Sequence, residues 1–142
     1  MLEKDFKKFI TDSLKEDIGD GDHSSMASIP IDAINKAHLI VKDEGIIAGL
    51  ELAKMIFNQV DDSLKITSYL KDGDKVKFGD IAFIVEGNSI SILTAERLVL
   101  NCMQRMSAIA TKTSYLNSLI STTNCKLLDT RKTTPLNRKL EK

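Results

Sequence analysis

The sequence predicts a protein of the α+β class, with a small sheet between two helical segments. Three observations lead to this prediction. Apolar residues recur at helical spacing at the start of the chain and again over residues 94–121, and β-rich runs with glycine turns fill the region between them. The length of 142 residues and the hydrophobic content of 42% suit one domain, or one small domain and part of another.

The chain begins with a predicted amphipathic helix. Four apolar residues recur at every fourth position with charged residues between them: Leu2, Phe6, Ile10 and Leu14. The segment EDIGDGD contains two glycines and should end this helix near Gly19. The polar stretch 23–30, which closes on Pro30, is predicted to be a loop.

Residues 37–93 are predicted to form a small mixed sheet with one helix. A strand, a turn at Gly45 and a short second strand precede an amphipathic helix over residues 51–60. LKITSYL and IAFIVEG are β-rich, and glycine turns separate them. SISIL follows, and Gly87–Asn88 between the last two runs predicts a β-hairpin.

A long helix is predicted after this sheet. Thr94 is a suitable N-cap, and Glu96 adds a favourable negative charge to the first turn. Helical spacing of apolar residues continues to about Ile120. We expect this helix to complete a first domain over residues 1–121.

The end of the chain is predicted to begin a second domain, over residues 122–142. CKLLDT, residues 125–130, has the length and apolar content of a strand, and Asn137–Lys142 suits the start of a helix. A strand, a loop and a helix in this order are how a βα unit begins.

Composition excludes several classes of protein. Twenty Lys and Arg balance twenty Asp and Glu, whereas a nucleic-acid-binding domain normally carries an excess of cations. The two cysteines suit neither a disulfide scaffold nor a CxxC metal site, and Cys102 is interpreted as packed core. The sequence has no apolar run of signal-peptide or membrane-span length, so we expect a cytoplasmic protein that binds neither nucleic acid nor a membrane.

The strongest chemical signal is the run DTRKTTP, residues 129–135, at the end of the predicted strand. In α/β folds, ligands gather at the carboxyl ends of strands. Arg131 and Lys132 are adjacent cations flanked by hydroxyl groups, with Arg138 and Lys139 beyond them, and this pattern suits a carboxylate or a phosphate. A solvated basic loop explains the same residues, and composition alone leaves both interpretations open.

Arg97 is a second candidate, because it lies about one turn inside the predicted helix, near an end that favours anions. An exposed arginine paired with Glu96 or Asp80 is the other interpretation. The two histidines, His23 and His38, have no metal-ligand spacing around them, so we expect neither to be catalytic.

The motifs resemble those of a known family. AERLVLNCMQRMSAIAT, residues 95–111, together with DTRKTTP resembles the pattern of the quinolinate phosphoribosyltransferases, also called carboxylating nicotinate-nucleotide pyrophosphorylases. EDIGDGDHSS, LIVKDEGIIAGLELAKMIF and LKDGDKVKFGDIAFIVEG resemble further segments, so the resemblance covers the whole chain. A sister family associated with molybdenum transport genes shares much of this pattern and is an alternative.

The resemblance implies a fold and a reaction. The fold is an N-terminal, hammerhead-like α/β sandwich followed by an α/β barrel, of which this chain would hold the first strand. Family members are dimers with shared active sites, and some form hexamers. They transfer phosphoribosyl from phosphoribosyl pyrophosphate to quinolinate, releasing CO₂ and pyrophosphate and giving nicotinate mononucleotide for NAD biosynthesis. Mg²⁺ accompanies the pyrophosphate, and its ligands are expected in the part of the barrel that this chain lacks.

The resemblance also implies site residues. Thr130, Arg131 and Lys132 match the loop that holds the quinolinate carboxylates. Arg97 matches an arginine lent to the partner's site across the dimer interface, and Arg138 matches a basic position after the loop. No residue of this chain is implied as a nucleophile, a general base or a metal ligand.

The chain departs from the family at Leu136, where relatives often place glycine after the proline. Family chains are also much longer, so we expect this chain to be a fragment that is inactive alone. The alternative is a non-catalytic binding or assembly module that keeps the N-terminal fold.

Overall fold

The computed structural model describes the backbone of residues 2–142 and the side chains of residues 5–142. Helix α1 (Leu2–Ile18) confirms the first predicted helix, although the side chain of Leu2 lies outside the described residues. Its inner face carries the apolar residues that pack on the core: Phe6, Phe9, Ile10 and Leu14. The four-residue spacing therefore identified the buried face of α1.

Three strands form the main sheet, in the order β1 (Ile34–Ile40), β5 (Ile81–Asn88) and β3 (Lys65–Ser68). A second ladder joins β2 (Gly45–Ile46) to β4 (Lys75–Val76). All the strand pairs described are antiparallel, so the prediction of a mixed sheet was wrong. An antiparallel sheet can keep one face in water.

The main sheet has this two-sided character. In its register, Ala37 and Ile66 flank Val85 on the covered face. On the open face, Lys36 lies opposite Glu86, and the two form an ion pair at 2.9 Å. The alternation of apolar and charged residues along the strands thus sets which face meets the helices.

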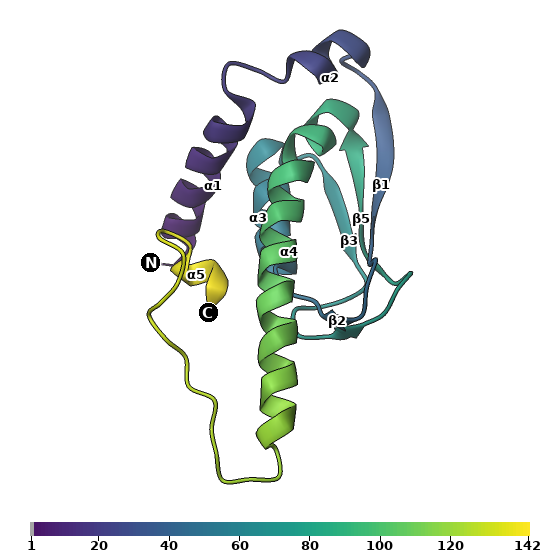
Figure 1. Cartoon of the computed structure of the whole chain (residues 1–142). Coiled ribbons are helices and arrows are strands. Elements are labelled where there is room, and N and C mark those ends of the chain that lie inside the picture. The colour runs from purple at the N-terminus through teal and green to yellow at the C-terminus, as the bar shows by residue number, and fades with distance from the viewer. Residues whose placement is uncertain (1) are drawn as a thin grey trace.

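Two helices, α3 (Leu50–Val60) and α4 (Ser89–Ile120), cover the inner face of the sheet (Figure 1). Ile56 of α3 is fully buried between them. Phe57 meets Phe83 edge to face, with ring centroids 5.8 Å apart and planes at 80°. Burial of this apolar surface is the main favourable contribution to the stability of the fold.

Helix α4 begins at Ser89, so the predicted start at Thr94 and the predicted hairpin at Gly87–Asn88 were both wrong. Asn88 is the N-cap: its side-chain oxygen accepts the backbone N–H groups two and three residues ahead, at 3.0 and 3.1 Å. Asparagine favours helix N-caps as well as turns, and here the cap prevails because the helical stripe already includes the buried Ile92.

A short helix, α2 (His23–Ser28), replaces the loop predicted over residues 23–30. Asp22 caps it by accepting the backbone N–H of Ser25 at 3.2 Å, and hydrogen bonds from Ser25 lower the pKa of Asp22. The sequence did not predict this helix, because so short a polar segment shows no apolar periodicity.

Two hydroxyl groups of α4, one turn apart, hold the chain around β2. Ser107 accepts the backbone N–H of Ala48, and Thr111 accepts that of Ile46, each at 2.9 Å. Gly45 permits this approach, since a Cβ atom there would lie 2.5 Å from the Thr111 hydroxyl oxygen. Ser107 and Thr111 of the QRMSAIAT motif therefore have a structural role.

The C-terminal tail, residues 121–142, runs back from the end of α4 toward α1 and ends in the short helix α5 (Arg138–Glu141) (Figure 1). Residues 121–137, all of which are described, contain neither helix nor strand, so the strand predicted over residues 125–130 is not formed. A strand needs a neighbour to share its ladder hydrogen bonds. The short final helix was predicted correctly, and the division into two domains stays a prediction.

Candidate functional site

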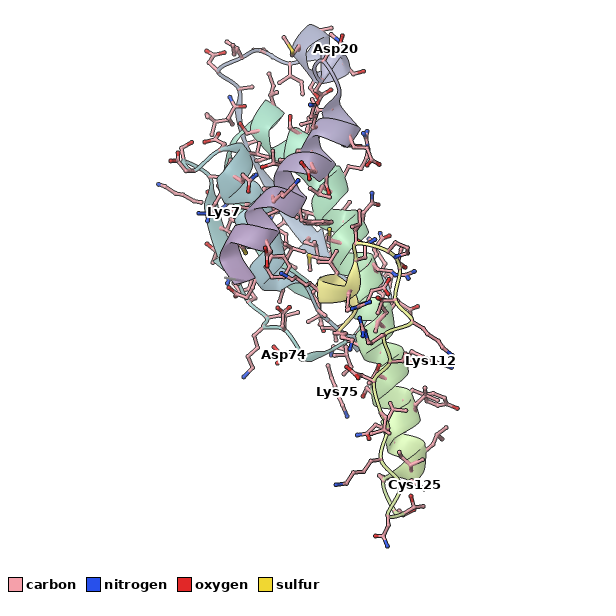
Figure 2. All side chains as sticks on the ribbon, turned by 90° about the vertical axis from the view of Figure 1, so that its left-hand side faces the viewer. Lys7, Asp20, Asp74, Lys75, Lys112 and Cys125 are labelled. Atoms are coloured by element: carbon pink, nitrogen blue, oxygen red, sulfur yellow. The ribbon has the colours of Figure 1, made fainter. Side chains whose placement is uncertain are left out.

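The C-terminal tail carries most of the residues predicted to bind substrate. Four of them lie on it with exposed side chains: Thr130, Arg131, Lys132 and Arg138. Cys125 marks the far turn of the tail, away from the sheet (Figure 2). Leu140 is the buried residue of this described stretch, and it joins the core beside α4. The tail is thus a mostly exposed segment with one apolar anchor.

An arginine and a glutamate that the sequence analysis missed fasten the tail to α4. Arg105 donates to Glu141 Oε1 from Nε at 3.0 Å and from Nη2 at 2.6 Å, and Nη2 also donates to the Thr134 hydroxyl at 3.0 Å. Glu141 Oε2 accepts the backbone N–H of Thr134 at 3.0 Å. Hydrogen bonds from Thr134, and then from Arg105, lower the pKa of Glu141 to about 2. We call these three residues the Arg105 clamp.

Two further ion pairs hold the end of the tail. Lys139 pairs with Asp5 of α1, and Lys142 pairs with Asp129 at 2.7 Å. Each of these lysines is thereby matched to a carboxylate, so its charge is partly neutralised within the chain.

Three other cations of the tail lack such a match. Among the described side chains, none forms an ion pair with Arg131, Lys132 or Arg138. Arg138 donates two long hydrogen bonds, to the Thr133 hydroxyl at 3.4 Å and to the Arg131 carbonyl at 3.5 Å. The Thr130 hydroxyl accepts the backbone N–H of Lys132 at 3.2 Å and so shapes the loop. The uncompensated charge is available to an anion, and arginine can hold a carboxylate through two hydrogen bonds.

Arg97 lies roughly two turns after the start of α4, so it is not at a helix N-terminus as predicted. It donates to Asp17 of α1 at 2.8 Å, rather than to Glu96 or Asp80, and this bond raises the pKa of Arg97. The side chain is 69% exposed. Within the described residues, no hydrogen bond or ion pair joins Arg97 to the tail, so a single chain does not bring the two groups of cations together.

A groove of about 800 Å³ between α1 and α4 is not suited to an anion. Its charged lining consists of four carboxylates and two cations: Asp5, Asp12, Glu16, Asp17, Lys8 and Arg105. Both cations are already paired, with Asp12 and Glu141 respectively. Three of the carboxylates, those of Asp5, Asp12 and Asp17, are paired as well, so the described lining of the groove offers an anion no free cation, and the exposed side of the tail is the better anion site.

Other reactive residues form no second site in the described part of the chain. His23 pairs with Asp20 at 3.1 Å, and His38 is exposed on β1. Cys102 is packed in the core as predicted, and burial raises the pKa of its thiol to about 11. Among the described residues, no three potential metal ligands lie together, and no helix has the length and apolar content of a membrane span.

Comparison with known proteins places these motifs in context. The family model described as quinolinate phosphoribosyl transferase, N-terminal domain, matches residues 22–107. A quinolinate phosphoribosyltransferase [decarboxylating] of Nicotiana tabacum is 46% identical over 97% of this chain. A probable nicotinate-nucleotide pyrophosphorylase [carboxylating] of Bacillus subtilis is 38% identical over 96% of it. The family model includes Arg97 and Arg105, whereas the tail is covered by the whole-chain relatives.

Solved structures agree with these relatives. The nicotinate-nucleotide pyrophosphorylase of Francisella tularensis superposes with a TM-score of 0.92 at 38% identity, covering 98% of this chain. NadC of Streptococcus pyogenes gives a TM-score of 0.90 at 32% identity over 94% of it. The chain spans 39% of the tobacco relative, 47% of the Bacillus relative and 49% of the Francisella structure.

Proposed function

Because the chain belongs to the quinolinate phosphoribosyltransferase family, we propose that it supplies the N-terminal domain and part of the substrate site of such an enzyme. The reaction transfers the phosphoribosyl group of phosphoribosyl pyrophosphate to quinolinate. It releases CO₂ and pyrophosphate and yields nicotinate mononucleotide, a precursor of NAD. The names of the tobacco and Bacillus relatives, together with the fold, support this activity.

The observation that carries the proposal is the uncompensated charge of the tail. Arg131, Lys132 and Arg138 lack carboxylate partners among the described residues, whereas the nearby Lys139 and Lys142 have them. Quinolinate is a dianion, so it needs cations that the protein does not neutralise itself. We propose that Arg131 and Lys132 bind the carboxylates of quinolinate and that Thr130 shapes the loop. Arg138 adds a positive charge just after the loop.

We assign Arg97 to the site of a partner subunit. Asp17 accepts from Nη1 of the Arg97 guanidinium, but the side chain is 69% exposed, so its other donors are open to a ligand held by a partner. Within the described residues it makes no polar contact with the tail of its own chain. A homodimer, or a hexamer built of dimers, would let Arg97 of one chain approach the tail of the other. The proposed cytoplasmic protein binds quinolinate and phosphoribosyl pyrophosphate, and neither nucleic acid nor a membrane.

The chemistry asked of these residues is positioning and charge balance. Displacement at the sugar carbon passes through a cationic state, so it needs an oriented acceptor more than a nucleophilic side chain. Loss of CO₂ leaves negative charge on the pyridine ring, and a nearby cation such as Lys132 would stabilise it.

We further propose that Mg²⁺ accompanies the pyrophosphate and is held outside this chain. Three carboxylates near the tail, those of Asp5, Asp129 and Glu141, are engaged by cations. They do not fit a divalent ion, which needs free oxygen ligands.

The test uses an extended chain, in which residues 1–142 continue to the length of the relatives, from the same gene or by fusion to the rest of the Bacillus relative. We expect Arg97→Ala and Arg131→Ala each to lower kcat/KM at least about a hundredfold, because replacing an arginine that holds a carboxylate removes two charge-assisted hydrogen bonds of about 1.5–3 kcal/mol apiece. Lys126→Ala, which removes an exposed cation of the same tail, is the matched control.

Mixing the two inactive variants should restore part of the activity, because one site of each mixed dimer then keeps both wild-type arginines. No rescue in dimers shown to be mixed would contradict the shared site. Full activity of Arg131→Ala would contradict the whole assignment.

The alternative is that the chain is a non-catalytic binding or assembly module. The observation that favours it is that the chain spans less than half the length of these relatives. The reading frame beyond Lys142 distinguishes the two: continuation into βα repeats supports the enzyme. Turnover of quinolinate by the extended chain would also distinguish the proposed enzyme from a member of the related family associated with molybdenum transport genes.

A further inference from the structure

The tail has few means of fixing its own shape. Over residues 121–137, which contain neither helix nor strand, most side chains are exposed. Leu128 and Leu136 are 83% and 99% exposed, so apolar burial does not hold them. The position of the Arg131–Lys132 loop must therefore depend on polar contacts made just beyond it.

Among the polar contacts described between the tail and residues 5–120, those of the Arg105 clamp reach nearest to that loop in sequence, at Thr134. The clamp uses both oxygens of Glu141, two nitrogens of Arg105, and the hydroxyl and backbone N–H of Thr134. The side chain of Glu141 is 7% exposed and that of Arg105 is 58% exposed, so one partner is shielded from water, whereas ion pairs that are open on both sides contribute little. Its geometry is that of a charge-assisted network rather than a single exposed pair.

Hydrogen bonds connect Thr134 to the residues that follow the loop, and these residues in turn contact the loop. It lies two residues after Lys132, and its carbonyl accepts the backbone N–H of Asn137 at 3.0 Å. Next to Asn137, Arg138 reaches back to the carbonyl of Arg131 at 3.5 Å. Fixing Thr134 therefore limits where Arg131, Lys132 and Arg138 can lie relative to one another.

The charge of Arg105 is not itself available to a substrate, because Glu141 takes two of its donors. We propose that Arg105 and Glu141 are positioning residues, which hold segment 131–138 in the geometry that binds the substrate dicarboxylate. This inference rests on the proposed function and adds to it the residues that prearrange the site.

The experiment compares four variants. Glu141→Gln keeps the size of the side chain but removes the charge, and Thr134→Val removes the hydroxyl that accepts Arg105. Thr134→Ser keeps that hydroxyl and is the conservative rescue. Glu86→Gln removes the carboxylate of the Lys36–Glu86 ion pair on the sheet and is the matched control.

Two quantities are measured. Amide exchange at Thr134 in the 142-residue chain reports directly on its hydrogen bond to Glu141. The Kd of quinolinate, by isothermal titration of the extended chain, reports on the site. For Glu141→Gln we expect about tenfold faster exchange and about tenfold weaker binding, the effect of losing one charge-assisted hydrogen bond. Thr134→Val should also weaken binding, while Thr134→Ser and Glu86→Gln should match the wild type.

The outcomes separate this inference from the proposed function. If the wild-type extended chain does not bind quinolinate, both fail. If it binds, and Glu141→Gln frees the Thr134 amide without changing Kd, the clamp only stabilises the tail and the positioning role is overturned alone. The same holds if Thr134→Ser weakens binding as much as Thr134→Val, because the hydroxyl would then not be the relevant group.

Discussion

The body of the molecule, residues 5–120, and the C-terminal tail are held by different forces. In the body, Ile56 and Val99 are almost wholly buried, and the helices and sheet share one apolar core. In the tail, as far as the structure describes it, Leu140 alone is buried, and the ion pairs that join the tail to the body are Arg105–Glu141 and Lys139–Asp5. The part that carries four of the five candidate binding residues is therefore the part with the least buried apolar surface.

This difference indicates which interactions fix the shape of the candidate binding site. Apolar burial is non-directional and fixes an element as a body. A loop of cations cannot be buried, so only directed hydrogen bonds fix its shape. The Arg105 clamp connects the body to the tail, because Arg105 belongs to α4 and Glu141 belongs to the tail.

The largest effect is expected from a substitution in the core, which tests whether the body and the tail differ in stability. Ile56→Ala removes a fully buried side chain from α3 and should lower the free energy of unfolding by about 2–5 kcal/mol. Leu128→Ala, its control in the tail, removes a side chain that is 83% exposed and should change stability by less than about 0.5 kcal/mol. Urea denaturation of the 142-residue chain measures both, and equal losses would show that the tail shares the core.

Sequence reasoning succeeded where apolar spacing decides structure. The helices α1 and α3 and the strand β5 follow from periodicity that burial enforces. It failed where a polar residue decides. Asp22 caps a helix that was read as a loop, and Asn88 caps a helix whose first five residues were read as part of a hairpin. It also failed for residues 125–130, whose strand composition lacks a neighbouring strand to pair with.

The candidate site was predicted only in part. The cations of DTRKTTP could be found from sequence because they are adjacent. Which cations are neutralised could not, because Arg97 and Asp17 are 80 residues apart and Arg105 and Glu141 are 36 apart. Such pairs exist only once α1, α4 and the tail have been brought together by the fold.

The two cysteines allow a chemical test of the same contrast. Cys102 is 6% exposed in the body, and burial raises its thiol pKa to about 11, so about one thiol in a thousand is ionised at pH 8. Cys125 is exposed in the tail. Since the thiolate is the reacting species, we expect Cys125 to be alkylated at least about a hundredfold faster under native conditions.

Mass spectrometry of iodoacetamide-treated protein gives the two rates. In urea, where the core is lost, they should become similar. Rapid native labelling of Cys102 would mean that the body opens as readily as the tail and that the two regions do not differ in stability.

The smallest expected effect concerns the turn that leads from the loop into α5. The backbone N–H of Asn137 donates to the Thr134 carbonyl at 3.0 Å, with Pro135 and Leu136 as the central residues. Leu136 has a φ of 67°, and a turn with proline first and a positive φ second favours glycine at that second position. A left-handed conformation costs a residue with a Cβ atom about 1–2 kcal/mol, and glycine loses about 0.5–1 kcal/mol in chain entropy.

Leu136→Gly should therefore favour the closed turn by up to about 1 kcal/mol and slow amide exchange at Asn137 by up to about fivefold. Leu136→Ala keeps the strain while removing a side chain that is 99% exposed, so it should exchange like the wild type. If alanine slowed exchange as much as glycine, the leucine side chain and not its backbone conformation would be the cause. A tail held by directed contacts would then owe part of its shape to a side chain that touches almost nothing.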